Sequence, residues 1–255
     1  MTDTDRTRRF YDTVAAAYAA ALPDTRAEAP FERGMIAQFV ADLPDGEGPV
    51  VDAGCGTGRL LAHLATLGAS PLAGVDLSPA MAAHARASHP DIPILVAELT
   101  ALPFPDATVR GILCWYAIIH SDADEVAAIS REARRVLLPG GPLLLGFQAG
   151  SGHRTIRGAY GHDVEMDAVL HEPEAVARVL ETAGFEITAV AERAARAGEK
   201  HSQGFVLARR LRAVPRRGTT VRPGAGRPDP CAAPPAGAPG RCATAASRGG
   251  PSSAR

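Results

Sequence analysis

The stretch Val50–Leu61 reads VVDAGCGTGRLL: an apolar run, an acid, three glycines on alternate positions, and then a run with helical character. A strand followed by a glycine turn and a helix forms a ligand site at the carboxyl edge of a parallel sheet. The glycines let the backbone approach a ligand closely, and the N-terminus of the helix favours a negative charge or a hydrogen-bond acceptor. This segment therefore predicts a fold class and the position of a binding site.

The spacing of Gly54, Gly56 and Gly58 separates three classes of ligand. A P-loop for phosphates requires a lysine after its last glycine, and none follows here. The dinucleotide fingerprint is G-x-G-x-x-G, whereas the third glycine of this chain comes one residue earlier. The spacing favours a nucleoside-type ligand without a pyrophosphate, and a nicotinamide dehydrogenase is the disfavoured alternative.

Strand and helix signals alternate through the body of the chain. This alternation predicts an α/β fold with a mainly parallel sheet and helices on both faces. We expect strands at 49–53, 71–75, 92–96, 109–116, 142–148, 185–191 and 204–209, and helices at 6–22, 31–43, 57–67, 78–88, 123–138 and 172–183. Ser78 and Pro79 suit the cap and the first position of the fourth of these helices.

Charge divides the 255 residues into two parts with different compositions. From Pro215 onward, seven arginines and one aspartate give a charge of +6; because the whole chain carries −1, the remainder carries −7. Residues 213–255 are rich in Pro, Gly, Ala and Arg and contain two large aliphatic residues, Val214 and Val221, and no aromatic. Such a segment buries too little apolar surface to offset chain entropy, so we predict one domain over residues 1–212 and a disordered tail over 213–255.

Composition also argues against several classes of protein. No run of about 18 apolar residues predicts a membrane span, and the charged N-terminus does not resemble a secretory signal. The four cysteines, at 55, 114, 231 and 242, suggest neither a disulfide framework nor, with the histidines, a metal site. A cytoplasmic protein without metal is the expectation, and an acidic body disfavours a nucleic acid as partner.

Four motifs in order resemble those of the class I S-adenosylmethionine-dependent methyltransferases, in particular small bacterial members that act on small molecules. They lie within residues 50–147, and the flanks from about Phe10 to Leu211 are similar as well. The resemblance implies a Rossmann-like, seven-stranded, mostly parallel sheet with an N-terminal helical lid, and S-adenosylmethionine as cofactor. The motifs read DAGCGTG at 52–58, GVDLSPAM at 74–81, AELTALPF at 97–104 and RRVLLPGG at 134–141.

The same resemblance assigns roles to residues around the expected cofactor. Asp76 would accept hydrogen bonds from both ribose hydroxyls, and Asp52 would face the methionine amino group directly or through water. Glu98 and the backbone of Leu99 would bind the adenine, although many members have Asp where this chain has Glu. The remaining expected contacts come from the glycine loop, the second motif and the lid: Gly54, Cys55, Gly56 and Gly58; Leu77 and Met81; Tyr11 and Tyr18.

The acceptor side is predicted from two segments. Cys114–Asp122 leaves a strand at the cofactor, and His120 is the candidate acid–base residue because its unperturbed pKa lies near neutrality; Trp115 and Tyr116 are candidate substrate contacts. Residues 150–172 follow the next strand and are expected to cap the acceptor pocket as a loop. Of the polar residues in that insert, we predict that Tyr160 and His162 line the pocket; the others are His153, Arg154, Asp163 and His171.

The predicted function is methyl transfer from S-adenosylmethionine to a small-molecule acceptor that the sequence does not identify. The alternative is a protein that binds S-adenosylmethionine and regulates without transfer, since both functions use the same cofactor residues. Either a monomer or a homodimer is compatible with the sequence.

Overall fold

The computed structural model describes residues 3–212, and the predicted tail lies outside them. A seven-stranded sheet has the order β3-β2-β1-β4-β5-β9-β8. The first five strands in this order pair in parallel, and β9 is antiparallel to both β5 and β8. The predicted seven-stranded, mostly parallel sheet is therefore confirmed. Its strands are β1 (Val50–Ala53), β2 (Leu72–Asp76), β3 (Ile94–Val96), β4 (Gly111–Trp115), β5 (Pro142–Gln148), β8 (Phe185–Arg193) and β9 (Gln203–Arg210).

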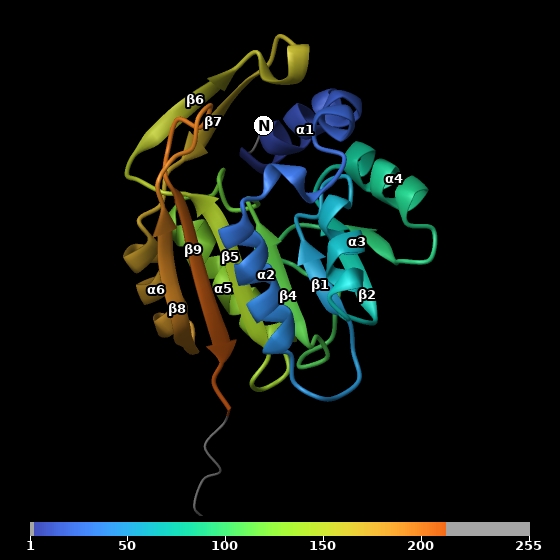
Figure 1. Cartoon of the computed structure of the whole chain (residues 1–255), viewed down its shortest axis with the longest axis vertical. Coiled ribbons are helices and arrows are strands. Elements are labelled where there is room, and N and C mark those ends of the chain that lie inside the picture. The colour runs from blue at the N-terminus through green and yellow to red at the C-terminus, as the bar shows by residue number, and fades with distance from the viewer. Residues whose placement is uncertain (1–2, 213–255) are drawn as a thin grey trace, which may run out of the picture. The chain divides into compact units, whose positions relative to one another are not determined.

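Helices cover both faces of the sheet (Figure 1). On one face, α5 (Ala123–Val136) and α6 (Pro173–Thr182) bury Ile129 and Leu180 against the strands. On the other face, Phe39 of α2 (Pro30–Ala41) and Leu64 of α3 (Arg59–Thr66) pack against β1, β4 and β9. Apolar side chains at helical spacing thus meet strands that are buried on both sides, as a parallel sheet requires.

The carboxyl ends of β1, β2, β4 and β5 lie at one edge of the sheet, which α1 (Asp3–Ala21) covers. Phe10 and Val14 of α1 pack on Met81 of α4 (Pro79–Ser88). Asp12 of α1 accepts hydrogen bonds from the Ser78 hydroxyl at 2.5 Å and from the Ala80 backbone N–H at 3.1 Å. The predicted N-terminal helix therefore lies over the edge where the glycine loop emerges.

The insert after β5 is not the loop that we predicted. It forms an antiparallel hairpin of β6 (His153–Arg157) and β7 (Glu165–Val169), joined through the short helix η2 (Ala159–Gly161), and it stands beside α1 (Figure 1). Met166 of β7 and Ile156 of β6 pack with α1. The alternation of apolar and polar residues over Glu165–Val169 is a strand signal, and the polar residues of the insert concealed it.

In the part of the chain that the structure describes, no helix is both long enough and apolar enough to cross a membrane.

Candidate active site

A cavity of about 700 Å³ opens at the carboxyl edge of the sheet, between the strand ends and the covering α1 and β6–β7. Pockets of 300–1,000 Å³ at this edge of an open α/β sheet are typical binding sites for small molecules. Most of the predicted site residues line it: Tyr11, Tyr18, Gly54, Gly56, Asp76, Leu77, Met81, Glu98, Leu99, Trp115, Tyr116, His120 and Tyr160.

The glycine loop is held by the carboxylate of Asp76. Its Oδ2 accepts a hydrogen bond from the Gly56 N–H at 2.7 Å, and its Oδ1 accepts one from the Ser78 N–H at 2.8 Å. Burial raises the pKa of Asp76, and these two bonds oppose that rise. Asp76 lines the cavity, and a carboxylate has about four lone-pair positions, so it can still accept a hydrogen bond from a ligand there.

Gly54 and Gly56 are required by geometry. Both have positive φ, +82° and +54°, which side chains rarely adopt. A Cβ on Gly54 would lie 2.3 Å from the Cβ of Ala117, whereas a Cβ on Gly56 would meet only the ring of Tyr18 at 3.8 Å. The backbone of Gly56 thus faces free space in the cavity, as a cradle for a ligand does.

Four predicted site residues do not line the cavity. Cys55 is buried behind the loop against Gly74. Gly58 caps α3 and lies next to Ala85 and His89. His162 lies after η2, where its N–H bonds to the carbonyl of Ala159. Asp52, the fourth, lies beneath the loop in β1.

Asp52 is 1% exposed, and neither of its carboxyl oxygens has a hydrogen-bond partner among the described residues. Burial raises its pKa from 3.8 to about 7, with nearby Asp76 adding to the rise and Arg59 opposing it. A buried carboxylate without a partner is costly. The carboxyl group of Asp52 therefore lacks a hydrogen-bond donor or a cation beside it. The amino group of a bound methionine moiety would be such a partner.

Tyr11 and His120 meet across the cavity. The Tyr11 hydroxyl lies 2.9 Å from Nε2 of His120, and Nδ1 of the same ring lies 2.7 Å from the carbonyl oxygen of Asp167. A carbonyl only accepts, so Nδ1 carries the proton, and Nε2 of the neutral ring accepts the hydrogen bond from Tyr11. Burial lowers the pKa of His120, and burial raises that of Tyr11, so both groups are neutral near pH 7.

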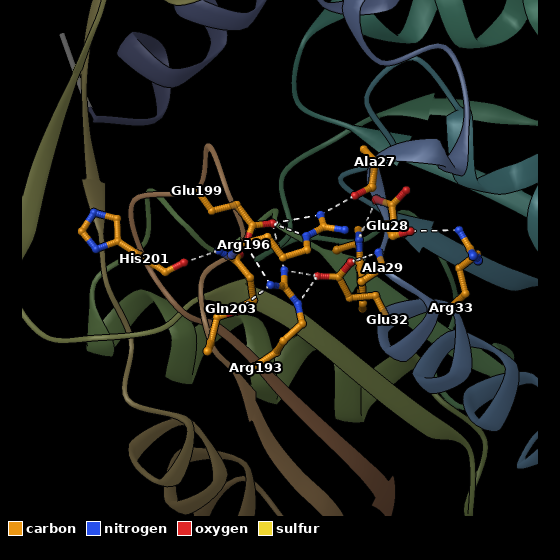
Figure 2. A network of polar contacts seen from close by, with 12 residues as sticks. Ala27, Glu28, Ala29, Glu32, Arg33, Arg193, Arg196, Glu199, His201 and Gln203 are labelled. Atoms are coloured by element: carbon orange, nitrogen blue, oxygen red, sulfur yellow. Dashed lines mark hydrogen bonds and ion pairs between the residues drawn. The ribbon is translucent and has the colours of Figure 1, made fainter.

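A polar network, buried at Glu32 and exposed at Arg196, lies on the side of the cavity near α2 (Figure 2). Arg193 at the end of β8 bonds Glu32 of α2 at 2.6 Å and Glu199 at 2.8 Å. Arg196 bonds Glu199 at 2.9 Å and the carbonyl of Ala27 at 2.7 Å. The network thereby attaches the β8–β9 connection to the segment that starts α2, and both contribute side chains to the cavity wall.

Glu28 connects this network to the glycine loop. Its Oε1 accepts from Nη1 of Arg59 at 2.5 Å and from the indole N–H of Trp115 at 3.3 Å. Its Oε2 is buried and has no partner among the described residues. Trp115 also stacks on Phe205, which explains why a predicted substrate contact is 5% exposed.

Sequence reasoning missed several residues of the cavity wall. Glu28, Glu32 and Glu199 come from segments that carry no recognisable motif, so only the folded chain brings them to the site. Arg154 was one of the polar residues of the insert, and it lines the cavity where the predicted His162 does not. Among residues 3–212, no cluster of three or more His, Cys, Asp or Glu side chains is arranged to hold a metal ion.

Part of this chain is similar in sequence to known proteins. Residues 50–141 match the family model described as a methyltransferase domain. A probable S-adenosylmethionine-dependent methyltransferase of Mycolicibacterium smegmatis is 35% identical over 142 residues, which are 54% of this chain and 52% of that protein. The match thus spans about half the length of this relative.

Solved structures share the fold at low sequence identity. Magnesium protoporphyrin IX methyltransferase of Synechocystis, solved with bound S-adenosylmethionine, has a TM-score of 0.60 at 19% identity and covers 82% of this chain and 98% of its own. The [4+2]-cyclase SpnF has a TM-score of 0.63 at 18% identity, covering 83% and 97%.

The fold is the Rossmann-like fold of these solved methyltransferase-type structures. Residues 50–141 are thus similar to a methyltransferase domain, and the relative that matches about half of this chain is described as a probable S-adenosylmethionine-dependent methyltransferase.

Proposed function

We propose that this protein transfers a methyl group from S-adenosylmethionine to a small-molecule acceptor. The observation that carries the proposal is one cavity wall on which Gly54 and Gly56, the carboxylate of Asp76 and the pair Tyr11–His120 lie together. The cofactor, when bound, supplies an electrophilic methyl group on a sulfonium.

Each wall residue has a role that its position supports. Asp76 accepts hydrogen bonds from the ribose hydroxyls with its free lone pairs. The loop backbone at Gly54 and Gly56 lies along the methionine part, and Asp52, which lies beneath the loop and not on the cavity wall, has the unpartnered oxygens that a water-bridged amino group would satisfy. Glu98 and Leu99, at the end of β3, hold the adenine. Positioning of this kind alone lowers the activation free energy by about 7–11 kcal/mol.

A proton must leave the acceptor only if the methylated atom carries one. In that case Tyr11 and His120 act together. The Tyr11 oxygen receives the acceptor proton while its own proton passes to Nε2 of His120, and the carbonyl of Asp167 holds the resulting imidazolium through Nδ1–H. General-base help of this kind contributes about 10²–10⁴-fold.

Two experiments test the proposal in sequence. Calorimetry of the full chain with S-adenosylhomocysteine should show binding, and Asp76→Ala should weaken it more than tenfold, about 1.4 kcal/mol. Incubation with S-adenosylmethionine and cell extract should then yield a product heavier by one methylene, detected by mass spectrometry. Binding without any such product would favour the regulatory alternative, and absence of binding would refute both.

A further inference from the structure

The inner face of the β6–β7 hairpin carries one residue that does not fit its surroundings. Side chains alternate along both strands: Thr155 and Arg157 point outward and are exposed, whereas Ile156, Met166 and Ala168 point inward and are partly or fully buried. Arg154 follows the inward phase and pairs with Ala168 in the strand register. A charged side chain thus occupies an inward position in an otherwise apolar series.

Arg154 reaches the cavity without a carboxylate to neutralise it. It is half-buried, and its Nε donates to Oε1 of Gln148 at 2.9 Å. No acid among the described residues forms an ion pair with it, and burial lowers its pKa. A guanidinium has five N–H donors in a planar fork, so the side that carries the two terminal nitrogens remains available.

The other arginines on the cavity wall differ from Arg154 in this respect. Arg59 pairs with Glu28 at 2.5 Å, and Arg196 pairs with Glu199 at 2.9 Å. Partial burial of an unpaired charge is unfavourable, and a ligand that supplies the counter-charge would offset that cost. Among the arginines that line the cavity in the described structure, Arg154 is the one without a carboxylate partner.

Arg154 lies in the part of the cavity that contains Tyr11 and His120. Arg154, Tyr11 and His120 line the same cavity, and Arg154 pairs across the hairpin with Ala168, the neighbour of Asp167, whose carbonyl oxygen lies 2.7 Å from Nδ1 of His120. Phe10 and Ile156 supply apolar surface around the same group. An anion held by Arg154 would therefore place the rest of an acceptor molecule beside the proton-accepting pair.

We propose that the acceptor carries an anionic group, a carboxylate or a phosphate monoester, and that Arg154 binds this group through its terminal N–H donors. The inference rests on the proposed methyl transfer and adds to it the chemical class of the acceptor and the residue that selects it.

The test is calorimetry on the full chain saturated with S-adenosylhomocysteine, using probes matched in shape and different in charge. The pairs are 4-hydroxybenzoate with 4-hydroxybenzamide, hexanoate with hexanamide, and phenyl phosphate with its neutral dimethyl ester. At least one anion should bind ten times or more tightly than its neutral partner. Arg154→Gln should reduce that preference to within twofold while leaving the affinity for S-adenosylhomocysteine unchanged.

Two further variants separate recognition from structure. Arg157 lies on the same strand but faces outward, where it pairs with Glu165 at 2.8 Å. Arg157→Gln should therefore keep the full preference for the anion. Arg154→Lys retains the charge without the fork and should keep a reduced preference. The inference is overturned if no anion binds more tightly than its neutral partner, or if the preference survives in Arg154→Gln. Absence of S-adenosylhomocysteine binding by the unaltered chain would instead count against the proposed function.

Discussion

Tyr11 donates a hydrogen bond to Nε2 of His120 across 2.9 Å, although the two residues are 109 positions apart in the chain. The other nitrogen of the ring bonds the carbonyl of Asp167 on β7. One imidazole thereby joins α1, the segment after β4 and the hairpin, which are the elements that enclose the cavity. The protonation state of His120 is therefore tied to the contacts among the elements that enclose the cavity.

The first prediction concerns that coupling. Tyr11 donates to the neutral ring, so this bond disfavours protonation, and Tyr11→Phe should raise the pKa of His120 from its lowered value. The measurement is NMR titration of the ring nitrogens. His171, whose Nε2 lies 3.1 Å from the carbonyl of Ile118 and whose pKa is also lowered by burial, serves as the internal control and should not move. A His120 pKa above 6.5 in the unaltered chain would contradict the assignment.

The same pair predicts a separation of binding from turnover. His120→Ala should leave the affinity for S-adenosylhomocysteine within twofold and lower turnover of an acceptor that must lose a proton by about 10²-fold or more. Calorimetry and product mass spectrometry measure the two effects on one preparation. Unchanged turnover would show that His120 is structural or that the acceptor needs no base.

Asp52 predicts a dependence of stability on pH. Its folded-state pKa of about 7 exceeds the ordinary value of 3.8, so between these values the folded chain holds a proton that the unfolded chain has lost. The free energy of unfolding contributed by this group therefore falls as the pH rises from about 4 to 7. Each pKa unit corresponds to about 1.4 kcal/mol, which bounds the effect at a few kcal/mol.

Asp52→Asn removes this titration without changing the shape of the side chain. Urea unfolding of both proteins without ligand should show the variant gaining stability relative to the unaltered chain as the pH rises through that window. A difference that stays constant from pH 4 to 8 would mean that the carboxyl is not held protonated.

Gly54 predicts a steric effect that a second glycine can calibrate. Gly54→Ala and Gly68→Ala both place a side chain at positive φ, +82° and +92°, which costs about 1–2 kcal/mol. At Gly54 the new Cβ also meets Ala117 at 2.3 Å, whereas at Gly68 nothing lies within 4 Å. Thermal or urea unfolding should therefore show a loss at Gly54 larger by about 1–3 kcal/mol. Equal losses would exclude the close contact.

The buried network of Arg193 predicts a contrast between two ion pairs. Arg193→Met leaves Glu32, whose side chain is 3% exposed, without its cation and should destabilise the chain by about 3–5 kcal/mol. Arg157→Met breaks a pair with Glu165 in which the side chains are 73% and 60% exposed, and should cost about 1 kcal/mol or less. Urea denaturation compares the two variants, and a similar cost for both would contradict the burial of the network.

Most of the sheet follows from local signals in the sequence. Apolar runs bounded by glycine and proline residues indicated the positions of its seven strands. Ser78 caps α4 as predicted, because its hydroxyl accepts a hydrogen bond from the Met81 N–H at 3.1 Å. The helix after the glycine loop begins at Arg59 because Gly58 has φ +82° and cannot be helical. Signals of this kind act within a few residues, which is why they can be read without a structure.

The acceptor side was harder to predict because its residues meet only after folding. Glu28 and Arg193 are distant in sequence, and neither occurs in a motif. In the insert, polarity indicated a loop, and the inward or outward direction of each side chain depends on a strand register that the sequence alone does not give. His162 was therefore expected in the pocket, where Arg154 lies.

The crystal structure of the chain with S-adenosylhomocysteine tests the central claim most directly. We predict the nucleoside at the carboxyl ends of β1 and β2, with both ribose hydroxyls within hydrogen-bond distance of Asp76 and the amino-acid part along Gly54 and Gly56. Density for the ligand at any other place, or a cavity that stays empty at saturating ligand, would contradict it.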